Sequence, residues 1–183
     1  TDSDGGIGES TVFIPVPLAA AGQGTGASAL TLAEVQSLVT QVRSLWVEAG
    51  AEIGALDALS FAIDDLPGTL LALVSLEADG PRLTLDRDAA GNGWFVDPTP
   101  VYSEEFTQYV SAEARRAATG DAAARVDLLT VLTHEFGHVL GLSHVDTNVA
   151  ANSVMIGELE LGVRRLPLTV DLTRALGGLL ING

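Results

Sequence analysis

The segment from Asp127 to Gly141, with the sequence DLLTVLTHEFGHVLG, constrains the fold more than any other part of the chain. Apolar residues cover most sides of a helix built from it, so this helix is predicted to lie buried in the middle of the molecule. Asp127 is a good N-cap, and Gly141 can end the helix in a left-handed conformation. Two histidines, His134 and His138, lie inside this stretch. Because buried polar side chains need partners, both are expected to have them.

These two histidines belong to a cluster that holds all three histidines of the chain. His134 and His138 are four residues apart and project from one face of the helix, about 6 Å apart along its axis. The exit at Gly141 turns the chain back, which brings His144 toward the same point. Three neutral imidazoles suit zinc at roughly 2.0 to 2.1 Å and leave the fourth tetrahedral position open, as in catalytic sites. Glu135, rotated about 100° from His134, cannot easily join as a ligand but can hold a water on the metal.

The stretch HEFGHVLGLSH, residues 134–144, matches H-E-x-x-H-x-x-G-x-x-H at every fixed position, and this is the signature of the metzincin zinc endopeptidases. Met155, the only methionine, lies eleven residues beyond the motif, where the family's Met-turn runs beneath the metal. Among metzincins the chain most resembles the matrixins, in particular the matrixin-like domains of large bacterial surface proteins. Residues 83–100 and 162–167 look like segments that accompany the zinc motif there. The resemblance spans roughly residues 30–175.

The resemblance implies an α+β, zincin-like fold. A twisted mixed β-sheet and two long helices would lie above an active-site cleft, and a small C-terminal lobe would carry the Met-turn and a helix, here over residues 170–180. The catalytic domain would span residues 31–183, with the upper lobe ending at about residue 141 and the lower lobe starting at about residue 142. Residues 1–30 would form an N-terminal linker or edge segment, with at most an edge strand over residues 11–18 because prolines interrupt it.

The resemblance also assigns a role to each residue of the cluster. The zinc ligands would be His134, His138 and His144. Glu135 would act as the general base and later as the acid, and Met155 would form the hydrophobic floor. Zinc lowers the pKa of its bound water from 15.7 toward about 7, while Glu135 passes the proton of that water to the leaving amine. No Pro or Tyr closely follows Met155, so the wall of the pocket after the cut must be built differently.

Periodicity elsewhere predicts a second helix and a sheet. From Thr31 onward, apolar residues recur at intervals of three and four positions, which is the period of a helix. Thr31 and Glu34 fit a capping box, so the helix is expected to start at Thr31. Short apolar runs separated by turn signals predict strands of one sheet over residues 58–66, 69–77 and 82–88. The Ala-rich, charged segment over residues 103–126 predicts a surface helix or helical loop, interrupted near Gly120.

One of these strands is a candidate for the edge along which an extended peptide substrate would lie. Leu71, Ala72 and Leu73 are at its centre, in TLLALVSLE. Main-chain pairing along such an edge gives affinity with little sequence selectivity. An ordinary core strand is an equally good interpretation of the same stretch.

A calcium site is a further hypothesis, with a turn interpretation as its alternative. Asp86, Asp88 and Asn92 place oxygen ligands at alternating and turn positions, which suits a hard cation such as Ca²⁺. The full twelve-residue calcium loop is missing, however, and Asp and Asn at a turn more often satisfy backbone groups.

Composition limits the partners. The formal net charge of -15 argues against binding to nucleic acid or to an anionic membrane surface, since both need clustered basic residues. The chain has no cysteine, so a metal must use other ligands, and no run of eighteen apolar residues is present to span a membrane.

Two functions from different classes remain. The first is a zinc endopeptidase that acts on protein or peptide substrates, as a monomer or as a module of a larger chain, secreted or on a bacterial cell surface. The second is a non-catalytic zinc-binding scaffold module of a bacterial adhesin-like surface protein. Glu135 favours the peptidase, because a purely structural site has no use for a buried carboxylate that binds nothing.

Overall fold

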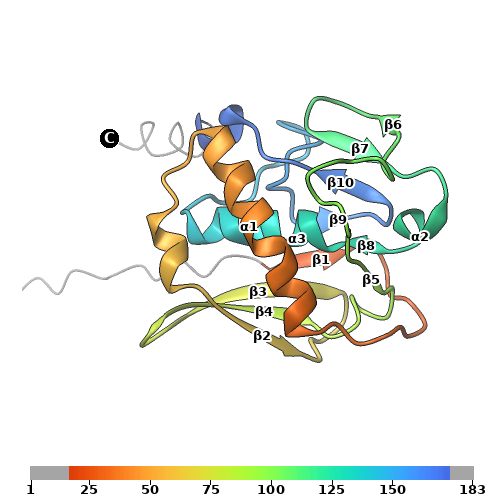
Figure 1. The fold of residues 1–183 in the computed structure, drawn as a ribbon, viewed down its shortest axis with the longest axis horizontal. Helices are drawn as coiled ribbons and strands as arrows, with labels where there is room; N and C mark the ends of the chain where they lie inside the picture. The colour runs from red at the N-terminus through yellow and green to blue at the C-terminus, as the bar shows by residue number, and fades with distance from the viewer. Residues whose placement is uncertain (1–16, 174–183) are drawn as a thin grey trace, which may run out of the picture.

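The computed structural model describes residues 17–173, which form a mixed α+β structure. Two long helices, α1 (Leu32–Ala49) and α3 (Leu128–Val139), lie on one face of a five-stranded sheet, as Figure 1 shows. The strand order in this sheet is β2-β4-β3-β1-β9. The predicted mixed sheet with two long helices is confirmed.

The three apolar runs between the helices are strands of this sheet, as predicted. The strand β3 (Leu70–Glu77) forms an antiparallel hairpin with β4 (Gly80–Asp86), and β4 also pairs in parallel with β2 (Ser60–Asp64). On the other side of β3 lies β1 (Leu18–Ala20), which is antiparallel to β3 and parallel to β9 (Glu158–Leu159). The two strands are joined by a two-residue turn, Ala78 and Asp79, and Gly80, with a φ of 126°, pairs with Glu77 at the start of β4.

The capping box predicted at the start of α1 is present. The Thr31 hydroxyl accepts from the Glu34 backbone N–H at 3.3 Å, and the Glu34 carboxylate accepts from the Thr31 backbone N–H at 2.8 Å. The helix ends at Gly50, whose φ of 97° is left-handed. Its buried face, which holds Trp46, packs toward α3, and the Trp46 indole N–H donates to the Thr133 carbonyl at 3.0 Å. The position of α1 is therefore tied directly to the helix that carries the histidines.

Replacing Thr31 with alanine is expected to lower the free energy of unfolding by about 1 kcal/mol, because the N-terminal amides of α1 lose their side-chain acceptor. Thermal or urea unfolding followed by circular dichroism measures the change. Thr40→Ala makes the same chemical change at an exposed position in the middle of α1 and is expected to be nearly neutral. Equal effects of the two variants would show that the capping box contributes nothing.

The helix α3 begins and ends as predicted. Asp127 is the N-cap, and its carboxylate accepts from the Thr130 backbone N–H at 3.2 Å. From Leu128 to His138 every residue of α3 is buried. The chain then leaves the helix at Gly141, whose φ is 90°. A left-handed residue of this kind costs glycine little and costs other residues more.

The prediction of a helix over residues 103–126 is wrong for most of that segment. The structure has two short strands there, β6 (Gln108–Tyr109) and β7 (Ala114–Arg116), and only four helical residues in α2 (Gly120–Ala123). The strand β7 pairs antiparallel with β10 (Val163–Arg165), nearly fifty residues further along the chain. Helix propensity of alanine is worth less than these long-range backbone pairs, and Gly120 starts the short helix rather than interrupting a longer one.

Three smaller elements complete the described part of the chain: the 3-10 helix η1 (Gly54–Ala58) and the two-stranded pair of β5 (Trp94–Phe95) with β8 (Val126–Asp127). Residues 169–173 are helical, at the start of the helix expected over residues 170–180, whose remainder lies outside the described residues. Within residues 17–173 no helix combines the length and the apolar character needed to cross a membrane.

The segment between β1 and α1 is hydrogen-bonded to the loop that follows β4. Backbone N–H groups of Gly24 and Gly26 donate to the carbonyls of Ala90 and Gly91 at 2.9 and 3.1 Å. The expected edge strand over residues 11–18 falls largely outside the described residues, and the observed strand β1 starts at its last position. The described residues before α1 are therefore bound to the domain by the backbone.

Candidate metal centre

The structure brings the three predicted histidines together at one point. His134 and His138 project from α3, and His144 comes from the loop that follows it. The Nε2 atom of His134 lies 2.9 Å from Nε2 of His138 and 3.0 Å from Nε2 of His144. Among the described residues, these three form the group of His, Asp, Glu or Cys side chains that is able to hold a metal ion.

The outer nitrogens of two of these rings are held by backbone carbonyls. His134 Nδ1 lies 2.7 Å from the Val154 carbonyl oxygen, and His138 Nδ1 lies 2.8 Å from the Leu142 carbonyl oxygen. A carbonyl oxygen only accepts, so both Nδ1 atoms carry the proton, and the Nε2 atoms of the neutral rings present lone pairs. Backbone partners of this kind orient metal-binding histidines in proteins.

Burial keeps these rings neutral. It lowers the pKa of His134 well below its ordinary value and, against the Leu142 carbonyl, lowers the pKa of His138 to about 4. Burial also lowers the pKa of His144. Neutral Nε2 lone pairs that face one another at about 3 Å repel, and a cation between them removes that repulsion. The donor set therefore fits one divalent ion that prefers imidazole, such as zinc.

Met155 packs against the helix that carries two of the histidines, and its role as the hydrophobic floor stays a prediction. Its side chain is fully buried, and its carbonyl accepts from the backbone N–H of Val145, next to His144, at 3.0 Å. A Cβ added at Gly137 would lie only 2.5 Å from the Met155 sulfur. The glycine between the two helical histidines thus allows the Met155 segment to approach the helix.

Gly157 is a residue of the centre that sequence reasoning missed. A Cβ at this position would lie 2.7 Å from two atoms of the His144 ring, Cε1 and Nδ1. The third histidine therefore rests against a backbone that has no side chain. The sequence offers one signal, the Ile-Gly pair directly after Met155. This pair does not indicate a contact with His144 unless the fold is known.

Glu135 is fully buried beside the histidines. Neither of its carboxylate oxygens has a hydrogen-bond partner within the described residues. Burial raises the pKa of Glu135 to about 8; the backbone N–H of Leu18 opposes this shift from beside the carboxylate, without reaching hydrogen-bond geometry. A carboxylate buried without a partner is costly, so its position calls for a functional explanation.

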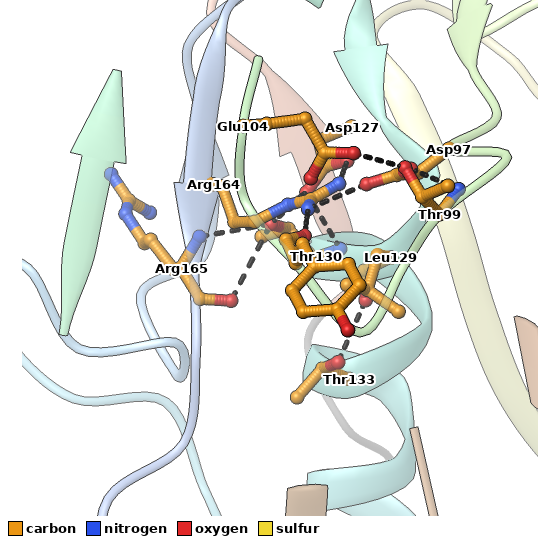
Figure 2. A network of polar contacts seen from close by, with 10 residues as sticks. Asp97, Thr99, Glu104, Asp127, Leu129, Thr130, Thr133, Arg164 and Arg165 are labelled. Carbon is orange, nitrogen blue, oxygen red and sulfur yellow. Dashed lines mark hydrogen bonds and ion pairs between the residues drawn. The ribbon is translucent and has the colours of Figure 1, made fainter. Parts of the chain in front are cut away.

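A buried ion-pair network fixes the first turn of α3, and Figure 2 shows it. The Arg164 guanidinium, on β10, lies between two buried carboxylates, at 2.7 Å from Asp97 and 2.8 Å from Asp127. Although burial alone disfavours its charge, the carboxylates of Asp127 and Asp97 raise the pKa of Arg164 above its ordinary value. The N-cap of the histidine helix is therefore also an ion-pair partner of a distant strand.

The residues considered for calcium satisfy backbone groups instead. The Asp86 carboxylate accepts from the backbone N–H groups of Leu66 and Ala90 at 2.8 and 2.6 Å, and Asp88 accepts from Gly91 at 2.7 Å. The Asn92 side-chain amide donates to backbone carbonyls, among them that of Gly22. These contacts match the turn interpretation of Asp86, Asp88 and Asn92, and a calcium site there stays a prediction without structural support.

The strand considered as a substrate edge is not free at the expected place. Leu71 and Ala72 are buried in β3, and β3 is bordered by β4 on one side and by β1 on the other, where Leu18 pairs with Ala72. The binding of a substrate by Leu71, Ala72 and Leu73 therefore stays a prediction. The structure adds that part of this edge is already paired.

The fold and the site together define a class. A buried helix presents two histidines at i and i+4 and the following loop returns a third, which is the ligand arrangement of the metzincins. A family model for matrixins matches residues 65–175, more than half of the chain, so the chain belongs to the matrixin family of peptidases. Neither the curated proteins nor the solved structures give a match. The family predicted from the motif is confirmed.

Proposed function

We propose that the chain is a zinc-dependent endopeptidase in which His134, His138 and His144 bind one catalytic zinc ion and Glu135 is the general base. The observation that supports this most strongly is the pairing of three converging Nε2 lone pairs with a neighbouring buried carboxylate that has no partner within the described residues. A structural zinc site requires the first feature and has no use for the second.

In this proposal backbone carbonyls orient the histidine rings, and Glu135 transfers the proton. Zinc, when bound, would polarise the carbonyl of the peptide bond to be cut and favour ionisation of the attacking water. The backbone carbonyls of Val154 and Leu142 hold two of the rings in the tautomer that ligates. Glu135 would take the proton of the attacking water and deliver it to the leaving amine, so that one carboxylate serves both steps. The apolar surroundings raise the proton affinity of Glu135, which suits a group that must accept a proton and then give it up.

The substrates proposed are proteins or peptides in extended conformation, since members of a peptidase family act on such chains. We place the enzyme outside the cell, secreted or on a cell surface, acting as a monomer or as the module 31–183 of a larger chain. The acidic surface, with a formal net charge of -15, suits such a setting through solubility.

The second candidate is a scaffold module in which zinc is structural. It shares the histidine cluster with the peptidase and differs only in giving Glu135 no task. The two functions separate in a single assay series with the purified chain, a quenched peptide library and zinc. Hydrolysis that is lost with a chelator and restored by zinc supports the peptidase. A zinc-loaded chain that binds a peptide yet cleaves none of the library supports the scaffold.

Gly157→Ala is expected to lower the zinc affinity about ten-fold or more, because the new Cβ would push the His144 ring away from the other two. Competition with a chelating dye measures the zinc dissociation constant directly, whether or not the protein is active. Gly54→Ala is the matched control, because a Cβ at Gly54 meets nothing within 4 Å. Zinc affinity that is equal in both variants would mean that His144 is not a ligand.

A further inference from the structure

We propose that residues 17–21 of the chain fill the strand position beside its own histidine cluster in which an extended peptide substrate would bind, and so hold the site closed. This inference rests on the proposed function for the identity of the site. The part of the chain concerned is the strand β1 with its two flanking residues, and the position it fills is the strand position between β3 and β9, as Figure 1 shows.

Backbone hydrogen bonds hold this segment on both sides, in the manner of an added strand. On one side the Ala20 N–H donates to the Thr69 carbonyl at 2.8 Å. On the other side the Ala19 and Ala21 N–H groups donate to the carbonyls of Gly157 and Leu159 at 3.1 and 3.0 Å. The alternation is that of a peptide added between two strands, which binds extended chains mainly through the main chain.

The pairing of this segment is short and local. It covers Leu18 and Ala19 on β3 and Ala19 and Ala20 on β9, with an irregular register between Leu18 and Ala19. A strand of three residues contributes few backbone bonds to the sheet, and the chain on its far side continues into a connection over residues 21–31. Without β1, the hairpin of β3 and β4 and its pairing with β2 stay intact, because those pairs do not involve it.

The segment lies beside the carboxylate of the proposed general base. The Leu18 backbone N–H lies beside Glu135, and the Leu18 side chain is buried to 1% exposure. In peptide hydrolysis the carboxylate delivers its proton to the amide nitrogen of the bond that breaks. The amide beside Glu135 is that of the Pro17–Leu18 bond, so the segment covers the carboxylate that the amide of a substrate would have to reach.

Two features of the centre follow from this occupancy. Gly157 contacts both the segment and the histidine cluster. Its carbonyl accepts from the Ala19 N–H, and its Cα faces the His144 ring. The strand position between β3 and β9 therefore adjoins the histidine cluster directly. Glu135 is fully buried in this state, whereas a general base must reach water and substrate, so the segment must leave before a substrate is cut.

Tethering gives the segment an advantage over any free peptide. A segment linked by a short connection competes with an effective concentration in the millimolar range. If it fills the position more than nine-tenths of the time, the apparent affinity for a free peptide falls at least about ten-fold. Release of the segment is expected to raise the apparent affinity for a free peptide by the same ten-fold or more.

The test measures peptide binding in the full chain, loaded with zinc and carrying Glu135→Ala so that nothing is cut. The probe is a fluorescein-labelled peptide of residues 16–23, VPLAAAGQ, followed by anisotropy. Leu18→Glu places a charge in the buried position and is expected to release the segment and tighten peptide binding at least about ten-fold. Ala21→Glu adds the same charge at an exposed neighbour and is expected to bind the peptide like the parent. A peptide with Glu in place of Leu should bind none of the variants.

A Leu18→Glu protein that folds and binds the peptide no better than the parent overturns the proposal. Ala19→Pro, which removes the N–H that bonds to Gly157 without adding a charge, decides the matter should Leu18→Glu lose its cooperative thermal transition. A folded Ala19→Pro with tighter peptide binding supports the proposal, and one without it overturns the proposal. If both variants unfold, β1 is an integral strand and the proposal is wrong.

The same variants separate this proposal from the proposed function when Glu135 is restored. Tighter peptide binding by Leu18→Glu without any hydrolysis means that the segment does occupy the site and that the chain is not a peptidase. Hydrolysis at equal rates by the parent and by Leu18→Glu means that the chain is a peptidase and that the segment does not block it.

Discussion

Glu135→Ala is expected to lower kcat/KM for peptide hydrolysis by about 10²- to 10⁴-fold while zinc stays bound, because the variant loses the group that accepts and returns the proton but keeps all three imidazoles. A quenched peptide assay gives the rate, and metal analysis of the same sample gives the zinc content. Glu48→Ala, at an exposed position on α1, is expected to have the activity of the parent.

The comparison is made in the parent and again in the Leu18→Glu background, so that a closed site is not mistaken for a lost carboxylate. Hydrolysis that persists at the parental rate in Glu135→Ala would rule out the proton-transfer role. Loss of zinc from Glu135→Ala would instead indicate that the carboxylate takes part in holding the metal.

Arg164→Met is expected to lower the free energy of unfolding by about 3–5 kcal/mol, the typical cost of removing one partner from a buried ion pair. The change leaves the Asp97 and Asp127 carboxylates without their common counter-ion in a site where Arg164 is only 1% exposed. It also weakens the N-cap of α3, because Asp127 serves both. Urea unfolding of the chain measures the loss.

Arg116→Met removes the same charge from an exposed ion pair with Glu160 and is expected to cost less than about 1 kcal/mol. A similar small loss in both variants would mean that the buried network does not stabilise the helix start. The two arginines lie on paired strands, β7 and β10. They therefore differ mainly in burial, and the difference between the two losses in stability reports the effect of burial.

The parts of the fold that could be predicted are those written in local patterns. The period of apolar residues and the capping box predicted α1, and the same period with an N-cap aspartate and a terminal glycine predicted α3. The spacing of His134 and His138 on one helix, with Gly141 before His144, was enough to predict that three rings converge. Each of these inferences needs no knowledge of what lies far away in the sequence.

The parts that could not be predicted depend on partners far apart in the chain. The Ala-rich segment over residues 103–126 forms strands because β10 pairs with β7, and that pairing leaves no trace in local composition. Arg164 finds Asp127 thirty-seven residues before it, and nothing in the sequence around either residue indicates the pair. Leu18 reaches Glu135 in the same way, from a proline-interrupted stretch for which no place in the sheet beyond an edge was expected.

The chemistry of the site was therefore more predictable than its accessibility. The zinc motif contains the predicted ligands, the predicted base and the glycine at the end of the helix within eleven residues. These features can therefore be predicted from the sequence alone. Whether the site is open depends on the strand position between β3 and β9, which is formed by residues from three separate parts of the chain.

X-ray absorption at the zinc edge, on the chain loaded with one equivalent of zinc, tests most directly whether His134, His138 and His144 share a single ion. The predicted spectrum has three imidazole nitrogens at about 2.0–2.1 Å and one further light-atom ligand. His138→Ala should remove one imidazole from that shell and weaken binding. A shell with fewer than three imidazoles in the parent, or one left unchanged by His138→Ala, would contradict the convergence of the three rings on the metal.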